Sequence, residues 1–592
     1  NHVLVTLSNY GVTSVYESTD GGTSFTAIEG NLPDMPVRWG IFLPSGSNEG
    51  VIALATELGV FTTTTTNGAS TVWVSNNSGF PKVRTDMLKY RYSDNTLAAA
   101  THGRGIFSTT LGITPVTWTG TTSNLWTTAS NWSTSRVPTI TDEVIIPNVG
   151  TLPVISTPQT VNKITINSGA TLTISNDLQV AGHIENNGNI SGSGNVIIAG
   201  FSGQTIGGSG TINNLILRNN ATIASGVLNI TGLLSITSGT LTTNGNLVLK
   251  SNAAGTASIG QIIGSITGNV TVERYIPAGN RSFRFLTPMV TTTNYIKNNW
   301  QEGVNNTSLL YVNNQNPNAN YGTHITGSTT GLNGFDATLT GNPSFYQFDN
   351  ITQNWNNGIA NTNAINLVAG NAYRLLIRGN RSYDLSNTLT TNTATILRAT
   401  GTLLTGNITF GSSSSTPSTL PILASNANEF SFIGNPYASP IDWNTLSKSE
   451  LTNYYYYWDP TLGVRGAYVS CKNDGTKSNS SSNITTSIQP GQAFFVQNSS
   501  NIAARQLAIT EANKITGNTN VFRPTSGTST MSLQLFLTSN ITSNGTSQDG
   551  LNVLFNSSYN NAVDDDDATK FVNQDENIAV QRDNKLLSIE NR

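Results

Sequence analysis

Four consecutive aspartates, Asp564 to Asp567, form the densest group of ligand-type side chains in the sequence. Adjacent carboxylates raise one another's pKa unless a cation or hydrogen-bond donors neutralise them, and Ca²⁺ prefers such oxygen ligands. Because four neighbouring side chains cannot all point at one ion, the sequence predicts at most a calcium site that uses Asp564 and Asp566. The regular EF-hand spacing is absent, and the alternative is a solvated acidic loop. The histidines are scattered and predict no metal site: His2, His102, His183 and His324.

A run of aromatic residues offers a second candidate site. Tyr454 to Tyr457 leads directly into Trp458, and Trp443 lies shortly before it. Side chains alternate between the two faces of a strand, so about two of the four tyrosines should be exposed. Exposed Tyr beside Trp suits the recognition of glycans or proteins. The predicted binding residues are Trp443, Tyr455, Tyr457 and Trp458, with ordinary strand packing as the alternative.

Catalytic motifs do not emerge from the sequence. It contains no Gly-x-Ser-x-Gly elbow, no His-Glu-x-x-His zinc motif and no phosphate-cradling loop after a strand. A glycosidase needs two carboxylates that face each other across a cleft, and only Asp442 and Asp459, near the aromatic run, are worth testing. No catalytic residue is predicted, and binding or structural work fits better than turnover.

The composition limits which class of protein this chain can belong to and which partners it is expected to bind. Charged residues make up 10% of the 592 residues, against about 25% in typical soluble domains. The net charge of −3 gives no electrostatic reason to expect nucleic acid or an anionic membrane. Cys471 is the single cysteine, so an internal disulfide is excluded. No run approaches the ~20 apolar residues of a membrane span. The chain opens on a strand-like segment without Met, and we expect both ends to be cuts through larger structure.

A repeated pattern between Lys163 and Lys250 predicts the central architecture. Short runs that mix aliphatic residues with Thr, Ser and Asn alternate at period two, as in Ile164–Ile174, and Gly or Asn punctuates them. A strand of three to five residues cannot bury its apolar face alone, so successive turns must stack on one another. The pattern predicts a β-solenoid, with a meandering sandwich as the alternative.

The first region, residues 1–112, resembles the last blades of an Asp-box propeller of the BNR or sortilin-like kind. The segment Ser18–Phe25 matches the pattern Ser-x-Asp-x-Gly-x-x-aromatic at Ser18, Asp20, Gly22 and Phe25. The resemblance implies a hairpin turn in which the aspartate accepts backbone N–H groups, the glycine adopts the unusual dihedral and the aromatic ring packs inside the blade. It implies a structural role for Asp20 and no catalytic one. Two or three blades are too few to close a ring.

The second region, residues 113–270, resembles a module of secreted Bacteroidetes proteins. Trp118, Trp126 and Trp132 precede the run Val137–Pro147, and the repeats follow. The three tryptophans suit either a cap over the first solenoid turn, which hides unpaired strand edges, or a platform on which sugars stack. A Trp-capped β-solenoid-like domain is therefore expected here.

The remaining chain resembles the C-terminal region of large Flavobacterium-type surface proteins. Phe432–Trp443 and Ile488–Val496 carry the resemblance, which implies a β-rich sandwich region over residues 271–525. Residues 526–592 look like the first part of a further, jelly-roll-like sandwich. The fold class predicted for the whole chain is all-β.

These resemblances imply a secreted, cell-surface protein with a structural or adhesive role. They imply export by a type 9 secretion system, whose machinery would be a partner, and binding to a glycan or an extracellular surface. The alternative from another class is a polysaccharide-degrading enzyme, an Asp-box propeller glycosidase whose catalytic part lies mostly upstream of Asn1. A third reading is a spacer that holds a distant domain away from the membrane.

Overall fold

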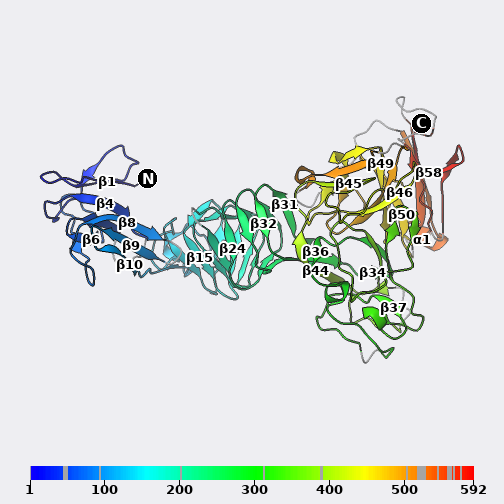
Figure 1. The fold of residues 1–592 in the computed structure, drawn as a ribbon, viewed down its shortest axis with the longest axis horizontal. Coiled ribbons are helices and arrows are strands. Elements are labelled where there is room, and N and C mark those ends of the chain that lie inside the picture. Colours follow the sequence, from blue (N-terminus) through cyan, green and yellow to red (C-terminus); the bar gives the residue numbers. More distant parts are fainter. Residues whose placement is uncertain are drawn as a thin grey trace. The chain divides into compact units, whose positions relative to one another are not determined.

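The computed structural model describes residues 2–44, 51–91, 95–200, 203–310, 314–386, 391–463, 465–501, 504–515, 529–542, 546–555, 563, 567–573 and 576–591. The chain is 43% strand and 4% helix, which confirms the all-β prediction. Figure 1 shows the strands by colour along the chain, from antiparallel sheets through a parallel solenoid to sandwiched sheets. No helix within these ranges is long and apolar enough to cross a membrane.

Antiparallel meanders build residues 3–110. They form sheets of three, four and three strands, joined by consecutive hairpins. Their strands are β1 (Val3–Thr6), β2 (Val15–Ser18) and β3 (Thr26–Ala27); β4 (Val37–Phe42), β5 (Ile52–Thr56), β6 (Gly59–Thr63) and β7 (Val74–Ser75); and β8 (Thr85–Arg91), β9 (Thr96–Thr101) and β10 (Gly105–Thr110).

A β-solenoid of about seven turns follows. Each turn contributes one short strand to each of three parallel sheets. Up to residue 230 the strands are β11 (Val116–Thr117), β12 (Glu143–Ile146), β15 (Lys163–Ile166), β18 (Ile184–Asn186), β21 (Gln204–Gly207) and β24 (Ala221–Ile223); β13 (Val154–Ile155), β16 (Thr171–Ile174), β19 (Asn189–Ser191), β22 (Thr211–Ile212) and β25 (Leu228–Ile230); and β14 (Gln159–Val161), β17 (Leu178–Val180), β20 (Val196–Ile198) and β23 (Leu215–Leu217).

Register explains why the solenoid forms. Ile164 pairs with Ile184, which pairs with Ile206, which pairs with Ile223, so one face of the sheet presents a continuous buried ladder. The residues that alternate with the buried ones along each strand, such as Thr165, point outward and stay partly exposed. A one-residue slip would expose the whole ladder, so the alternation predicted from the sequence also determines the register.

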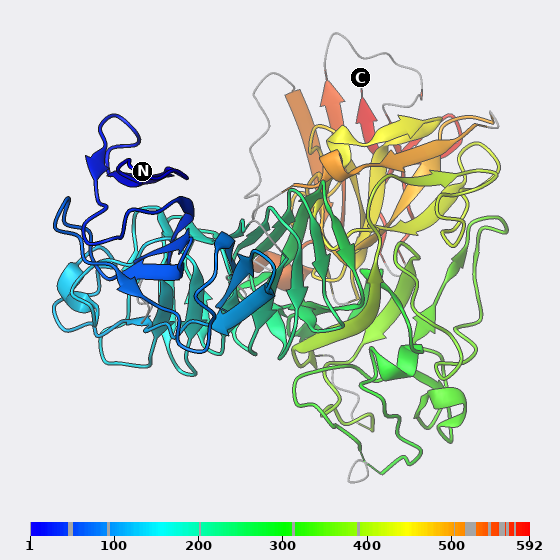
Figure 2. The same cartoon turned by 60° about the vertical axis from the view of Figure 1, so that its left-hand side comes forward.

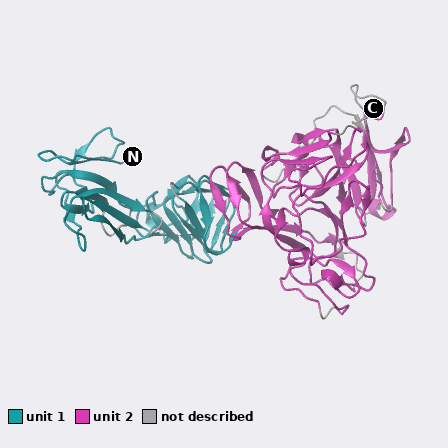
Figure 3. Cartoon of the chain, in the orientation of Figure 1, with its two compact units in different colours: residues 1–228 teal, residues 229–592 magenta. Residues whose placement is uncertain are grey.

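The chain divides into two compact units, residues 1–228 and 229–592 (Figure 3). The division falls inside the solenoid, because each turn of a solenoid contacts only its neighbours. In the second unit the parallel pairs are β26 (Leu233–Ile236) with β31 (Ser258–Ile262), β27 (Thr240–Thr242) with β32 (Ser265–Thr267), and β28 (Leu247–Leu249) with β33 (Val270–Ile276).

Strand β33 carries the chain from the solenoid into the sandwich. Its first residues, Val270 to Val272, pair with β28 in parallel, and its whole length pairs antiparallel with β44 (Thr395–Leu403). Among the sheets that follow, three consist of three or four strands (Figure 2). They are β35 (Ser282–Leu286), β42 (Tyr373–Ile377) and β39 (Phe345–Tyr346); β45 (Ile408–Gly411), β53 (Gln506–Ile509) and β48 (Ser447–Ser449); and β46 (Phe430–Gly434), β52 (Ala493–Asn498), β49 (Leu451–Asp459) and β50 (Ala467–Lys472).

The sheet β46–β52–β49–β50 is covered on both faces. One face packs Tyr455 and Phe494 against Phe410 and Leu507 of the neighbouring sheet. The other face packs Tyr454, Tyr456 and Phe495 into a second cluster. A last sheet adds Leu554, Ala568 and Ile589 to that cluster. It consists of β54 (Ser529–Leu535), β55 (Asp549–Phe555), β58 (Lys585–Asn591), β56 (Ala568–Thr569) and β57 (Val580–Arg582), beside the short helix α1 (Thr538–Thr542).

Candidate functional site

A cavity of about 580 Å³ lies within the second unit, where β33, β35 and β49 meet the turn before β52. The exposed residues Pro277, Asn483 and Gln489 line its outer part, and the buried residues Arg284 and Asp459 line its inner part. It therefore combines polar and charged groups in a concave surface that reaches solvent, which is the usual form of a small-ligand site.

Two arginines contribute positive charge to this cavity. Arg274 comes from β33 and Arg284 from β35. The Arg284 guanidinium donates to the carbonyl oxygens of Ser282 at 3.2 Å and Phe283 at 3.3 Å. The stem of Arg274 passes the turn at Gly491 (φ +78°), where an added Cβ would lie 3.6 Å from Arg274 Cδ. Burial lowers the pKa of both guanidinium groups, since desolvation disfavours the charged form.

Tyr457 and Asp459, at the end of β49, complete the polar lining. Tyr457 is partly exposed, and burial together with the charge of Asp459 raises its pKa to about 12, against the opposing effect of Arg284 and Arg274. The Asp459 carboxylate accepts bonds from Thr461 N at 2.9 Å, Thr461 Oγ1 at 2.6 Å and Ser482 Oγ at 2.5 Å. Both of its oxygens are therefore already bonded within the chain.

The four predicted binding residues do not lie together in one site. Tyr457 and Tyr455 line the cavity, whereas Trp443 and Trp458 lie in the two hydrophobic clusters, 0% and 5% exposed. Tyr455 is fully buried, and its hydroxyl donates to the Thr485 carbonyl. The expectation that about two of the four tyrosines would be exposed is wrong, because sheets cover both faces of β49 and leave only Tyr457 partly exposed.

Asp442 and Asp459 do not form a pair across the cavity. Asp459 lines it, but Asp442 lies at the end of β47 (Ile441–Asp442), where its carboxylate accepts from Asn444 N at 3.1 Å. The arrangement of two carboxylates facing a common cleft, which glycoside hydrolysis requires, is not made by these two residues.

The arginines were not predicted from the sequence. Both lie near the start of the region predicted over residues 271–525, in the segments Val272–Pro277 and Arg281–Pro288. A signal was present for Arg284, which interrupts the apolar run of β35, but it was weaker for Arg274, which follows Glu273 in β33. A long charged side chain in such a strand has to find a partner or a solvated cavity, but the sequence does not say which.

The segment Ser18–Phe25 forms the predicted turn in part. Asp20 accepts from Ser24 N at 3.0 Å, Thr23 N at 2.9 Å and Ser18 Oγ at 2.7 Å, and these bonds hold its pKa well below the usual range. Gly22 has φ +95°. The expected burial of the aromatic residue is wrong, since Phe25 is 47% exposed. The ring lies outside the hydrophobic cluster formed by Val15 and Ile28 of the flanking strands.

The three tryptophans at the start of the solenoid form a buried cluster. Trp132 meets Trp118 and Trp126 edge to face, with ring centroids 4.9 and 4.6 Å apart, and all three are at most 2% exposed. Trp118 Nε1 donates to Thr151 O at 2.8 Å, and Trp132 Nε1 donates to Trp126 O at 2.8 Å. Rings buried in this way serve as a cap and offer no face to a sugar.

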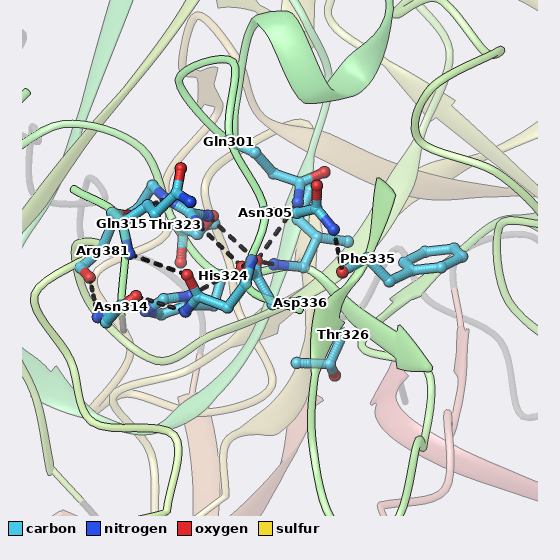
Figure 4. A network of polar contacts seen from close by, with 12 residues as sticks. Gln301, Asn305, Asn314, Gln315, Thr323, His324, Thr326, Phe335, Asp336 and Arg381 are labelled. Carbon is cyan, nitrogen blue, oxygen red and sulfur yellow. Dashed lines mark hydrogen bonds and ion pairs between the residues drawn. The ribbon is translucent and has the colours of Figure 1, made fainter. Parts of the chain in front are cut away.

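A second cluster of titratable groups lies around Asp336 (Figure 4). Asp336 accepts from Arg381 at 2.8 and 3.1 Å, and His324 Nδ1 lies 3.4 Å from Asp336 Oδ1. The backbone amides of Asn306 and Ile325 also donate to this carboxylate, at 2.8 and 3.0 Å. Asp336, His324 and Arg381 are all fully buried. The cluster therefore joins separate segments of the chain rather than presenting groups to a ligand.

The predicted calcium ligands, Asp564 and Asp566, lie outside the described residues, so that site stays a prediction. In the part of the chain that the structure does describe, no three His, Cys, Asp or Glu side chains gather where they could hold a metal ion.

Comparison with known proteins gives one partial match. Residues 117–200, the tryptophan cap and the first solenoid turns, match a family model described as a domain of unknown function, DUF8693. No curated protein and no solved structure matches the chain with significance.

Proposed function

We propose that this chain is a structural and adhesive part of a secreted bacterial cell-surface protein, and that the cavity at β33, β35 and β49 binds a glycan. Export by a type 9 secretion system belongs to the same proposal. The neutral polar surface suits an extracellular setting.

The observation that carries the proposal is the position of Tyr457 at the cavity. Its hydroxyl has no hydrogen-bond partner among the described residues, its side chain is partly exposed, and Tyr275 also lines the cavity. Aromatic rings pack against the C–H faces of sugars, while planar polar groups bond their hydroxyls. Gln489 and Asn483 supply such amide groups at the outer part of the cavity.

Glycan-array binding of the whole chain tests the proposal. We expect selective binding that Tyr457→Ala removes and Tyr10→Ala preserves, because Tyr10 is 59% exposed in the first unit and remote from the cavity in sequence. An array without signal, or equal binding by Tyr457→Ala, would contradict glycan binding at this site.

The export route needs a separate test. The gene with its natural flanking sequence is expressed in a Bacteroidetes host with and without a functional type 9 secretion system. We expect surface-exposed protein only in the first strain, detected by protease accessibility on intact cells. Equal surface exposure in both strains would contradict the proposed route.

A further inference from the structure

We infer that the saccharide bound at this cavity is acidic and that its carboxylate pairs with the guanidinium of Arg274. This inference rests on the proposed glycan-binding function and adds the chemical class of the ligand.

Arg274 differs from the other arginines of the described chain whose side-chain partners are known. Six of them form an ion pair with a carboxylate: Arg38 with Glu57, Arg84 with Asp86, Arg136 with Asp142, Arg381 with Asp336, Arg398 with Glu302, and Arg582 with Glu590. Arg374 lies instead over aromatic rings, 3.9 Å from the centroid of Phe283. The Arg274 guanidinium makes no hydrogen bond, ion pair or ring contact within the described residues, yet it lines the cavity.

The charge balance of the cavity favours an anion. Arg274 and Arg284 bring two positive charges, and Asp459 brings one negative charge. The Asp459 oxygens are engaged by Thr461 and Ser482, so this carboxylate does not serve as the partner of Arg274. A net positive charge in a partly desolvated cavity attracts an anionic group more strongly than the same charge in water.

The shape of guanidinium selects among anions. Its parallel N–H groups match the two oxygens of a carboxylate in a bidentate pair, which a lysine cannot form. The hydroxyl of Tyr457 and the amides at the outer part of the cavity remain for the neutral hydroxyls of the same sugar. A uronic acid combines both requirements in a single ring.

The first experiment uses the whole chain on an array that carries uronic-acid, sulfated and neutral saccharides. We expect the signal on the uronic-acid class, and we expect it to weaken as salt is raised, since screening affects charged pairs. Binding confined to neutral or sulfated saccharides would overturn the inference and leave glycan binding intact. An array without any signal would overturn both.

The second experiment measures affinity by calorimetry for the best uronic-acid ligand and for its methyl ester, which lacks the charge. We expect the ester and the variant Arg274→Gln each to weaken binding about 10- to 100-fold, the usual range for a hydrogen bond to a charged group. Arg104→Gln, at an exposed arginine of the first unit, should bind as the parent chain does.

The variant Arg274→Lys keeps the positive charge, so it separates the contribution of the charge from that of the bidentate geometry. We expect affinity between those of the parent and Arg274→Gln, because charge is retained and the bidentate geometry is lost. Because the Arg274 guanidinium has no hydrogen-bond or ion-pair partner among the described residues, Arg274→Gln should melt at the parent temperature or above it. Unchanged affinity in both Arg274 variants, or equal affinity for acid and ester, would overturn the inference.

Discussion

The amide of Ile262 donates a 2.9 Å hydrogen bond to Oε2 of Glu511, a residue 249 positions further along the chain. The other oxygen of this carboxylate accepts from Gly406 N, also at 2.9 Å, and Lys514 Nζ lies 2.7 Å from Oε2. One side chain thus connects β31, in the last solenoid turn, with the sandwich of the second unit. Covering β31 in this way removes an unpaired strand edge.

Glu511→Ala should destabilise the second unit by about 3 kcal/mol, because it leaves two amides and a buried lysine without their partner. Hydrogen exchange at Ile262 and Gly406 should accelerate, which mass spectrometry can follow. Glu576→Ala makes the same chemical change at an exposed position and should have little effect. Equal protection in the two variants would show that Glu511 does not hold the solenoid end.

Trp132→Ala should destabilise the first solenoid turns by about 3–5 kcal/mol, the usual cost of removing a buried aromatic side chain. The loss arises because Trp132 is the ring that contacts both Trp118 and Trp126. Thermal unfolding followed by tryptophan fluorescence measures the change. Trp39→Ala is the matched control, since Trp39 is 40% exposed. Similar melting of both variants would contradict the capping role.

Asp336→Asn should destabilise the protein at pH 7 by about 3–5 kcal/mol, because the buried Arg381 loses its counter-charge. The folded-state pKa of Asp336 lies well below its ordinary value, since its interactions with His324 and Arg381 outweigh the effect of burial. The stabilisation is therefore complete above the unfolded-state pKa of about 4. It is lost as the pH falls from there towards the folded-state pKa.

Urea unfolding at pH 7 and pH 3 tests this pH dependence. The difference between the parent chain and Asp336→Asn should be large at pH 7 and smaller at pH 3. Asp474→Asn, at an exposed position, should match the parent at both values. A difference that stays constant between the two pH values would contradict the assigned charge state.

Cys471 should not react with thiol reagents while the protein is folded. It is fully buried, and burial raises its pKa to about 12, so the reactive thiolate is scarce at neutral pH. Ellman's reagent should titrate no thiol in buffer and one thiol per chain in denaturant. A stoichiometric reaction in buffer at the rate of a free thiol would contradict the packing around β50.

The solenoid was predictable because its information is local. Alternation within Ile164–Ile174 decides which side chains face inward, and Gly169 (φ +79°) supplies the turn between two strands. The sequence identified the three tryptophans of the cap. It did not decide between a cap and a sugar platform, because that choice depends on whether the rings are buried. The calcium site at Asp564 and Asp566 remains a prediction from the sequence.

The candidate binding site was less predictable. Alternation along Tyr454–Tyr457 describes which residues share a face, but it does not say how many sheets cover that face. Likewise, nothing near Arg274 in the sequence shows that Asp459 is already engaged by Thr461 and Ser482, nearly two hundred residues away.

The sequence by itself determined that this protein is built from short strands, where its parallel repeats lie and which of their side chains point inward. These properties depend on neighbouring residues and on the two-residue period of a strand. Only the tertiary structure decided that β49 is covered on both faces, that Tyr457 remains accessible at a cavity, and that Arg274 lies there without an ion-pair partner among the described residues. Those properties depend on contacts between segments far apart in the chain, which local patterns do not encode.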